Sequence, residues 1–242
     1  MSRQQDLARY SRQIVLREVG VNGQQLLRDS SALVVGLGGL GSVAAMYLAG
    51  AGLGKLLLCD RDRVDASNLH RQLLYTQADV GRCKTETARE RLVALNREVT
   101  LETLTPDFLE AAIKAADVVL DCTDNFSSRF AINALCAKAR KPLVSGAAIR
   151  FEGQLAVFDL RKPDSPCYAC LYPQQGEGQE TCEEAGILGP VAGVIGSAQA
   201  LAALKLLLGI GDDASRLSLW NANTLEWKTL KLKRDPACKI HP

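Results

Sequence analysis

A glycine-rich turn is the first feature of this sequence that could bind a ligand. Gly36, Gly38 and Gly41 have the spacing of a phosphate-binding fingerprint, and Gly39 adds a fourth glycine. Such glycines let backbone amides approach a phosphate, and the N-terminus of the following helix attracts its negative charge. Asp60 ends the next apolar run, where an acid in such a fold hydrogen-bonds a ribose. The pattern predicts a nucleotide site; the alternative is that the glycines only let a helix pack closely on a strand.

The segment after Asp60 is dense in polar side chains. Its polar residues include Asp62, Ser67, Asn68, Arg71 and Gln72, and Lys84 follows after a short interval. Arg71 and Lys84 could hold the outer phosphates of a triphosphate, while Asn68 and Gln72 could position them through hydrogen bonds. Taken one at a time, these residues could equally be exposed polar groups on the rim of a loop.

A second polar run extends from Asp121 through Thr123 and Asp124 to Asn125, directly after an apolar strand. Open α/β sheets place their ligands at the carboxyl ends of the strands, so this run should face the glycine turn. We predict that Asp124 holds magnesium, because a hard cation prefers carboxylate oxygen. The alternative is that Asp124 caps the following helix with help from Asn125.

Two pairs of metal-ligating residues lie far apart in the chain. Cys167 and Cys170 form C-x-x-C, and Cys238 and His241 form C-x-x-H, a spacing compatible with a structural zinc site. The alternatives are reduced thiols without metal and a site built from three cysteines, because a ligand next to the C-terminus can fray.

Cys182 stands apart from these pairs, in a polar segment at 172–184 that reads as a mobile surface loop. A nucleophilic role would require the thiolate, which the neighbouring Glu183 and Glu184 oppose. A passive surface thiol is therefore an equally good interpretation.

Strands and helices alternate through the part of the chain that carries these residues. Apolar runs at 32–35, 55–59, 99–104, 118–120 and 142–145 predict strands, with helices between them, and a polar helical region precedes the first. Alternation of this kind predicts a Rossmann-like, doubly wound α/β fold with a mostly parallel sheet.

Beyond Gly146 the pattern changes. Segments 149–159, 217–220 and 225–232 read as antiparallel strands, so the sheet should become mixed toward the C-terminus. We expect a single domain over residues 1–242, with a zinc-binding appendage formed by 167–170 and 238–241.

Composition excludes several other classes of protein. The 29 basic and 27 acidic residues nearly cancel and form no block of one sign, which argues against nucleic acid as a partner. The polar N-terminus has no secretory signal, so we expect a cytoplasmic protein. Residues 185–204 carry no charge, but glycines interrupt them and Lys205 follows, so we expect a buried helix and no membrane span.

These motifs together resemble the ThiF/MoeB/HesA family, the bacterial relatives of ubiquitin-activating enzymes. The resemblance runs from Arg9 to the last cysteine and rests on four motifs: GLGGLG, D-x-D-x-V-x-x-S-N-L-x-R-Q, G-x-x-K and D-C-T-D-N. It implies that ATP and magnesium bind at the glycine turn. The C-terminal Gly-Gly carboxylate of a ubiquitin-like sulfur-carrier protein then attacks the α-phosphate, giving an acyl-adenylate and pyrophosphate.

The resemblance also implies roles for individual residues. Gly39 would contact phosphate, Asp60 the ribose, Asp124 magnesium, and the triphosphate would be held by Asn68, Arg71 and Lys84. Arg12 would reach into the neighbouring subunit's site in a homodimer. Cys182 stands where family members carry a cysteine that can attack the activated carrier. Family members usually carry a second C-x-x-C where this chain has Cys238 and His241.

Three functions compete at this point. Adenylation of a carrier protein is the preferred function. An NAD-dependent dehydrogenase would not need a triphosphate clamp made by Arg71, Lys84 and Asp124. A non-catalytic adaptor that only binds the carrier would have no use for that clamp either. Residues 145–150 and 152–154 resemble the activators of molybdopterin synthase, so its small subunit is the preferred carrier for molybdenum-cofactor biosynthesis. The thiazole carrier of thiamine biosynthesis is the alternative.

Overall fold

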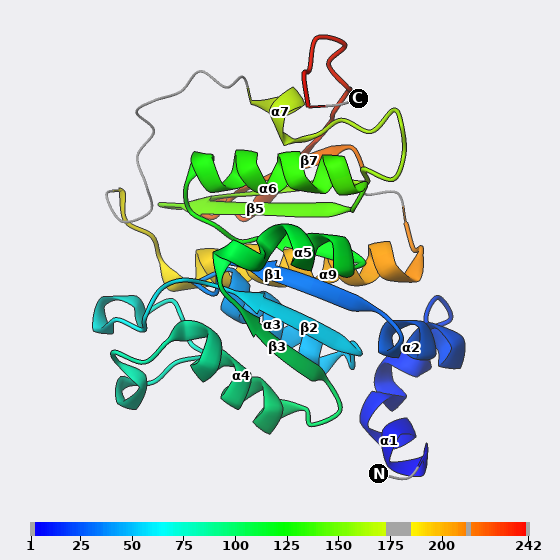
Figure 1. The fold of residues 1–242 in the computed structure, drawn as a ribbon, viewed down its shortest axis with the longest axis vertical. Coiled ribbons are helices and arrows are strands. Elements are labelled where there is room, and N and C mark those ends of the chain that lie inside the picture. Colours follow the sequence, from blue (N-terminus) through cyan, green and yellow to red (C-terminus); the bar gives the residue numbers. More distant parts are fainter. Residues whose placement is uncertain (1–2, 173–184, 212–213, 241–242) are drawn as a thin grey trace.

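The computed structural model describes residues 3–172, 185–211 and 214–240, whose strands form one eight-stranded sheet in the order β3-β2-β1-β4-β5-β6-β7-β8 (Figure 1). The strands are β1 (Ser31–Val35), β2 (Lys55–Cys59), β3 (Thr100–Leu104), β4 (Val118–Asp121), β5 (Leu143–Ile149), β6 (Glu152–Phe158), β7 (Arg216–Asn221) and β8 (Glu226–Lys231). Neighbours are parallel from β3 to β5 and antiparallel from β5 to β8. The predicted fold class is confirmed.

The register of the parallel strands brings their carboxyl ends to one edge. Val35, the last residue of β1, pairs with Cys59 of β2 on one side and with Asp121 of β4 on the other. The glycine turn, the segment from Asp60 and the run from Asp121 to Asn125 therefore start side by side. β1 and β4 are buried almost throughout, which explains why their sequences are apolar runs with no alternation.

β5 is longer than the sequence predicts. It continues past Gly146 to Ile149 and pairs along its length with β6, with Gly146 opposite Leu155. Glycine and alanine have low strand propensity, so the run Gly146–Ala148 gives no strand signal. A side chain at position 146 would overlap the amide of Gln199, so glycine is required there by the helix that crosses this strand.

Helices cover both faces of the sheet. One face packs on α3 (Gly41–Gly50), α4 (Lys84–Leu95) and α9 (Gly189–Leu208), and the other on α5 (Leu109–Ala115), α6 (Phe126–Ala139) and the short α7 (Tyr168–Leu171). The predicted N-terminal helical region is two helices, α1 (Arg3–Ile14) and α2 (Gly20–Arg28). Three 3-10 turns complete the loops: η1 (Ala66–Asn68), η2 (Gln77–Asp79) and η3 (Pro106–Phe108).

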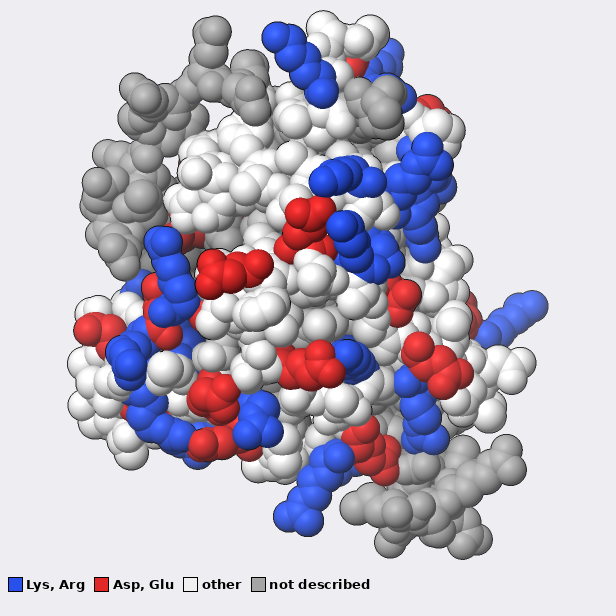
Figure 2. Space-filling model, viewed as in Figure 1, with Lys and Arg blue, Asp and Glu red and all other residues white. Residues whose placement is uncertain are grey.

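α9 is long and apolar enough to cross a membrane, with a mean hydropathy of 1.8 over its most apolar window. In the structure it crosses β4, β5 and β6 and packs against α3, with Val191, Ile195 and Ala203 buried. In the structure 44% of that window is buried, so the helix that was expected to be buried is only partly so. On the face seen in Figure 2, basic and acidic side chains are intermingled over most of the surface.

Candidate functional site

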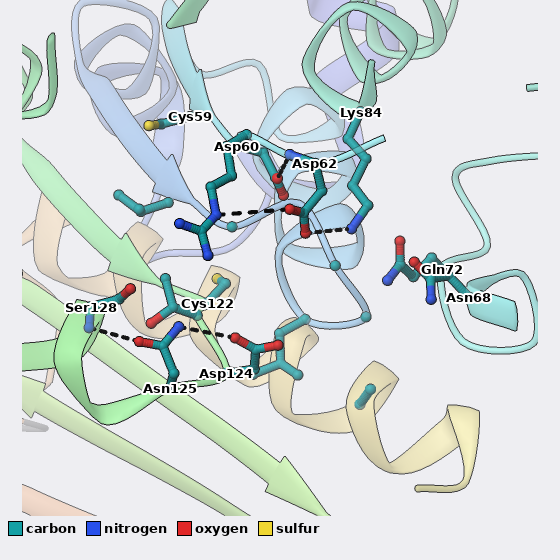
Figure 3. A pocket seen from close by; sticks show the side chains of 18 of the residues that line it. Cys59, Asp60, Asp62, Asn68, Gln72, Lys84, Cys122, Asp124, Asn125 and Ser128 are labelled. Atoms are coloured by element: carbon teal, nitrogen blue, oxygen red, sulfur yellow. Dashed lines mark hydrogen bonds and ion pairs between the residues drawn. The ribbon is translucent and has the colours of Figure 1, made fainter. Parts of the chain in front are cut away.

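A cavity of about 700 Å³ opens at the carboxyl edge of the parallel strands (Figure 3). Its lining includes twelve of the residues predicted from the sequence: Gly36, Gly38, Gly39, Asp60, Asp62, Ser67, Asn68, Arg71, Gln72, Lys84, Asp124 and Asn125. Gly41 and Arg12 do not line it. Cys182 and His241 lie outside the residues that the structure describes.

The glycines of the turn have different structural roles. Gly36 has φ +87°, and a Cβ there would lie 2.8 Å from the carbonyl oxygen of Cys122. A Cβ at Gly41 would overlap the carbonyl oxygen of Gly36. Gly41 therefore lets the helix pack closely on the strand, which is the alternative role considered for these glycines. Gly38 and Gly39 border the cavity itself. The turn ends at the N-terminus of α3, where an anion is favoured.

Asp60 ties the end of β2 to this turn. One oxygen of its carboxylate accepts a hydrogen bond from the Leu37 amide at 2.6 Å, and the other accepts from the Asp62 amide at 2.8 Å. The carboxylate therefore has a fixed orientation while it lines the cavity. Each carboxylate oxygen can accept a further hydrogen bond, which suits the predicted ribose contact.

Lys84 supplies a positive charge that is already oriented. It stands at the first position of α4 with its side chain only 6% exposed, and its Nζ lies 3.2 Å from Oδ2 of the more exposed Asp62. Arg71 comes from the loop after η1, where its guanidinium donates to the Ser67 carbonyl at 3.1 Å. Both cations border the same cavity, as the clamp hypothesis requires.

Asn68 and Gln72 lie beside these cations and are both buried. Asn68 donates to the Ser67 hydroxyl at 3.3 Å, while Asp65 caps η1 by accepting from the Ser67 amide at 2.8 Å. Hydrogen bonds from Ser67 lower the pKa of Asp65. The side-chain oxygen of Gln72 has no hydrogen-bond partner among the described residues, although a buried amide oxygen is normally paired.

The structure separates the roles of Asp124 and Asn125. Asn125 caps α6, because its side-chain oxygen accepts from the Ser128 amide at 2.9 Å. Its side-chain nitrogen donates to Asp124 at 3.2 Å (Figure 3). The alternative in which Asp124 caps the helix is therefore wrong. Asp124 is exposed at the cavity, where its carboxylate can meet a cation.

Three further residues support this edge: Asp121, which belongs to the predicted polar run but had no role assigned, and Arg129 and Gln199, which sequence reasoning did not assign to the site. Asp121 is fully buried; it accepts from the Thr123 amide and hydroxyl at 3.1 and 2.7 Å and from the Ser145 hydroxyl at 3.0 Å. Burial raises its pKa, while the charge of Arg129 opposes that rise. Gln199 donates from α9 to the carbonyls of Asp121 and Val144 at 2.8 and 3.2 Å. A lone amide in an apolar helix was the available signal for Gln199.

A cysteine cluster lies beside the middle of α6, where the side-chain nitrogen of Asn133 is 3.5 Å from Sγ of Cys167. The Sγ atom of Cys167 lies 3.8 Å from that of Cys170 and 3.8 Å from that of Cys238, and all three sulfurs lie within 4.8 Å of one another. Thiolates bound to one tetrahedral zinc at about 2.3 Å would be separated by about 3.8 Å. The three donors therefore fit a zinc ion. The structure brings together the three predicted cysteine ligands, but the predicted fourth, His241, falls outside the described residues.

Residues 10–240 match the model of the ThiF family. The chain belongs to the ThiF family. Two bacterial relatives match it over nearly their full lengths. The sulfur carrier protein ThiS adenylyltransferase of Escherichia coli is 46% identical over 240 residues, covering 97% of this chain and 95% of the relative. The molybdopterin-synthase adenylyltransferase of Salmonella typhimurium is 47% identical over 241 residues, covering 98% and 96%.

A solved structure resembles this ThiF-family chain in fold. Escherichia coli MccB in complex with ATP has a TM-score of 0.80 and 20% identity, with 97% of this chain and 74% of that chain covered. At that identity the likeness shows the Rossmann-like fold alone. The comparisons confirm the predicted family and the predicted enzyme class, an adenylyltransferase.

Proposed function

We propose that this protein uses ATP and magnesium to adenylate the C-terminal glycine of a small ubiquitin-like sulfur-carrier protein. One observation carries the proposal: a single cavity holds a glycine turn, an oriented carboxylate at Asp60, a buried cation at Lys84 and an exposed carboxylate at Asp124. The test is ATP/pyrophosphate exchange with a purified carrier that ends in Gly-Gly. Exchange that depends on the carrier supports the proposal. Exchange at the same rate without the carrier would refute the proposed substrate.

The lining of the cavity suits both parts of ATP. Pro106, Leu109 and Ile132 are apolar lining residues that offer a surface for the base. The glycine turn, Lys84 and Arg71 line the same cavity and suit the phosphates. A dehydrogenase would have no use for two cations and an exposed carboxylate, so the clamp favours a triphosphate.

The reaction is a displacement at the α-phosphorus. An oxygen of the carrier's C-terminal carboxylate bonds to that phosphorus, and the bond from phosphorus to the bridging oxygen of the β-phosphate breaks. Pyrophosphate leaves with the electron pair. Lys84 and Arg71 offset the negative charge that gathers on the phosphates, and their orientation by Asp62 and Ser67 is fixed before the substrate arrives. Magnesium held at Asp124 would neutralise further phosphate charge.

The carrier is the finer part of the proposal. The two relatives named above act on ThiS and on molybdopterin synthase, and their identities to this chain, 46% and 47%, do not separate the two. We prefer the small subunit of molybdopterin synthase because of residues 145–150 and 152–154. Apart from Arg150, these lie in β5 and β6, where Ala147 and Ala148 border the cavity. Exchange measured in parallel with both carriers decides between them, and a non-catalytic adaptor would show none with either.

A homodimer with shared sites is part of the proposal. Arg12 lies in α1, which packs on α2 near the amino ends of the strands, away from the cavity edge (Figure 1). It can therefore serve a cavity only in another copy of the chain. Exposed apolar side chains on the neighbouring helices α2, α3 and α9 offer an interface: Val21, Leu26, Tyr47 and Leu201. A closed two-fold pair is the commonest arrangement.

We also propose that the cysteine cluster holds one zinc ion, with His241 as the fourth ligand. Zinc there would cross-link the C-terminal segment to α7 and stabilise the fold. The proposed nucleophilic role of Cys182 and the cytoplasmic location stay predictions from the sequence.

A further inference from the structure

α6 connects the nucleotide cavity to the cysteine cluster. Its N-terminus is capped by Asn125 at the cavity. Two of its buried polar residues, Arg129 and Asn133, are separated by one helical turn and therefore lie on the same face of the helix. Arg129 contacts the cavity loop, and Asn133 contacts the cluster.

Arg129 holds the backbone of the loop that carries Asp124. It is 7% exposed, and its Nε and one terminal nitrogen donate to the Thr123 carbonyl at 3.3 and 2.8 Å. The amide and hydroxyl of Thr123 donate in turn to the buried Asp121. The peptide just before Asp124 is therefore fixed from both sides. A shift of Arg129 would move the Asp124 carboxylate.

Asn133 holds the first cysteine of the cluster. It is fully buried; its side-chain oxygen accepts from the Tyr168 amide at 2.9 Å, and its side-chain nitrogen lies 3.5 Å from Sγ of Cys167. Each side of Asn133 therefore contacts the start of α7, a helix of only four residues. A helix of one turn has little stability of its own, so its position depends on its packing against the core, on Asn133 and on the cluster.

Tyr168 closes the connection back to Arg129. Its ring packs edge-on against Phe130 with centroids 5.3 Å apart. The ring of Tyr168 also lies 4.9 Å from that of Tyr172, which packs edge-on against Phe126 with centroids 5.9 Å apart. The guanidinium of Arg129 lies over the Phe126 ring, 5.7 Å from its centroid. Aromatic contacts therefore link the start of α7 to Arg129.

We propose that α6 couples the cysteine cluster to the nucleotide cavity, so that a metal ion held by Cys167, Cys170 and Cys238 strengthens nucleotide binding through Asn133, Tyr168 and Arg129. With the cluster cross-linked, α7 is held and Arg129 keeps the Thr123 carbonyl in place. Without the cross-link, α7 and its contacts with α6 can shift, and the loop loses one of its two supports. The inference rests on the proposed function only for the identity of the nucleotide.

Linkage requires the effect to run in both directions: if the metal strengthens nucleotide binding, the nucleotide must strengthen metal binding by the same factor. The test uses the protein with its metal in place. Zinc is competed away with a zinc-selective chelator, with and without saturating magnesium and a non-hydrolysable ATP analogue, and the released metal is measured. We expect the analogue to raise the apparent zinc affinity about fivefold or more, the lower range of measured allosteric couplings.

Two variants test the route. Arg129→Lys keeps the charge but cannot give two hydrogen bonds to Thr123, so the ratio of zinc affinities with and without the analogue should fall toward one. Lys138→Ala is the matched control on the same helix, because the side chain of Lys138 is 69% exposed and forms an ion pair with Glu110. This control should keep the parental ratio.

The outcomes separate the coupling from the proposed function. An unchanged zinc affinity in the parental protein, when calorimetry shows that the analogue binds, would overturn the coupling, as would a parental ratio in Arg129→Lys. Protein isolated without metal that binds the analogue tightly would also overturn it. An analogue effect on zinc without carrier-dependent pyrophosphate exchange would instead support the coupling and refute the carrier.

Discussion

The nucleotide cavity and the cysteine cluster are built in opposite ways. The cavity is assembled by parallel strands whose carboxyl ends are aligned by their register, and hydrogen bonds within the protein orient Asp60, Lys84 and Asn125 before any ligand binds. The cluster joins residues from two distant segments, and its three thiols lie close together around a space that fits one ion. Damage to the cavity should therefore remove chemistry and spare the fold, while damage to the cluster should do the reverse.

Asp124→Ala should give the largest effect. We expect pyrophosphate exchange to fall about 100- to 1000-fold, the range seen when one group that stabilises transition-state charge is removed. The melting temperature should stay within about 2 °C of the parent, because the Asp124 side chain is exposed and does not cap α6. Exchange at the parental rate would contradict the magnesium assignment, and a large loss of stability would contradict the comparison itself.

Arg12→Ala should also abolish most exchange, although the residue lies far from its own cavity. Mixing this variant with Asp124→Ala should restore roughly a quarter of the parental activity, because half of randomly paired two-fold dimers are mixed and each has one complete site. The measurement needs verified subunit exchange. No recovery would mean that Arg12 acts within its own chain or has no role.

Cys167→Ser should lower stability more than it lowers chemistry. We expect zinc content to fall from about one per chain and the melting temperature to drop by several degrees, because a structural zinc contributes to folding free energy. Turnover at saturating ATP should stay within about tenfold of the parent, in line with typical coupling energies. Cys83→Ser is the control, since Cys83 is exposed and outside the cluster.

His241→Ala sharpens the same test. It should reduce zinc content less than Cys167→Ser, because it removes a neutral ligand and keeps all three thiolates. Metal analysis after preparation without chelators is the measurement. Zinc far below one per chain in the parental protein would leave the three cysteines as reduced thiols.

Lowering the pH should affect the two regions at different pH values, and this is the smallest of the expected effects. In the loop beside the cavity, Asp79 of η2 is 2% exposed and contacts Arg91 at 2.7 Å and Arg82 at 3.2 Å. Burial alone would raise the pKa of Asp79, but hydrogen bonds from Arg91 and Thr76 outweigh it and hold that pKa well below its ordinary value. Its contribution to stability is therefore complete above about pH 4 and is lost as the pH falls further.

Zinc thiolates are protonated at higher pH than that carboxylate, so zinc should leave before the loop loosens. Zinc release and hydrogen exchange of residues 76–82, followed over the same acid titration, check the order. Asp79→Asn should remove the acid-dependent step in the loop and leave zinc release unchanged. Loosening of the loop before zinc release would reverse the expected order.

The sequence predicted where the cavity lies because most of its polar residues closely follow strands. Asp60 and Asp124 come just after β2 and β4, Lys84 begins α4, and the alternation of strands and helices brings these positions to one edge. The support behind them was missed for a physical reason. Gln199 meets Asp121 and Val144 only when α9 crosses the sheet, and no local pattern records a contact over such a separation.

The assignment of the helix cap shows a finer limit. Asp124 and Asn125 are both good capping residues, so propensity alone cannot choose between neighbours. The choice depends on where α6 begins, and helix ends are the least certain part of any pattern. The structure decides it through the hydrogen bond from the Ser128 amide to Asn125, which leaves the Asp124 carboxylate for the cavity.

Gln199 also limits how α9 can be aligned on the sheet. The helix is apolar on most of its surface, and apolar contacts alone would tolerate sliding by one turn in either direction. Any such slide would strand the Gln199 amide in the core without its two carbonyl partners, at a cost of about 1–3 kcal/mol. One buried amide therefore gives an apolar helix a single permitted register, and with it a single position for Ala192, which α9 contributes to the cavity wall.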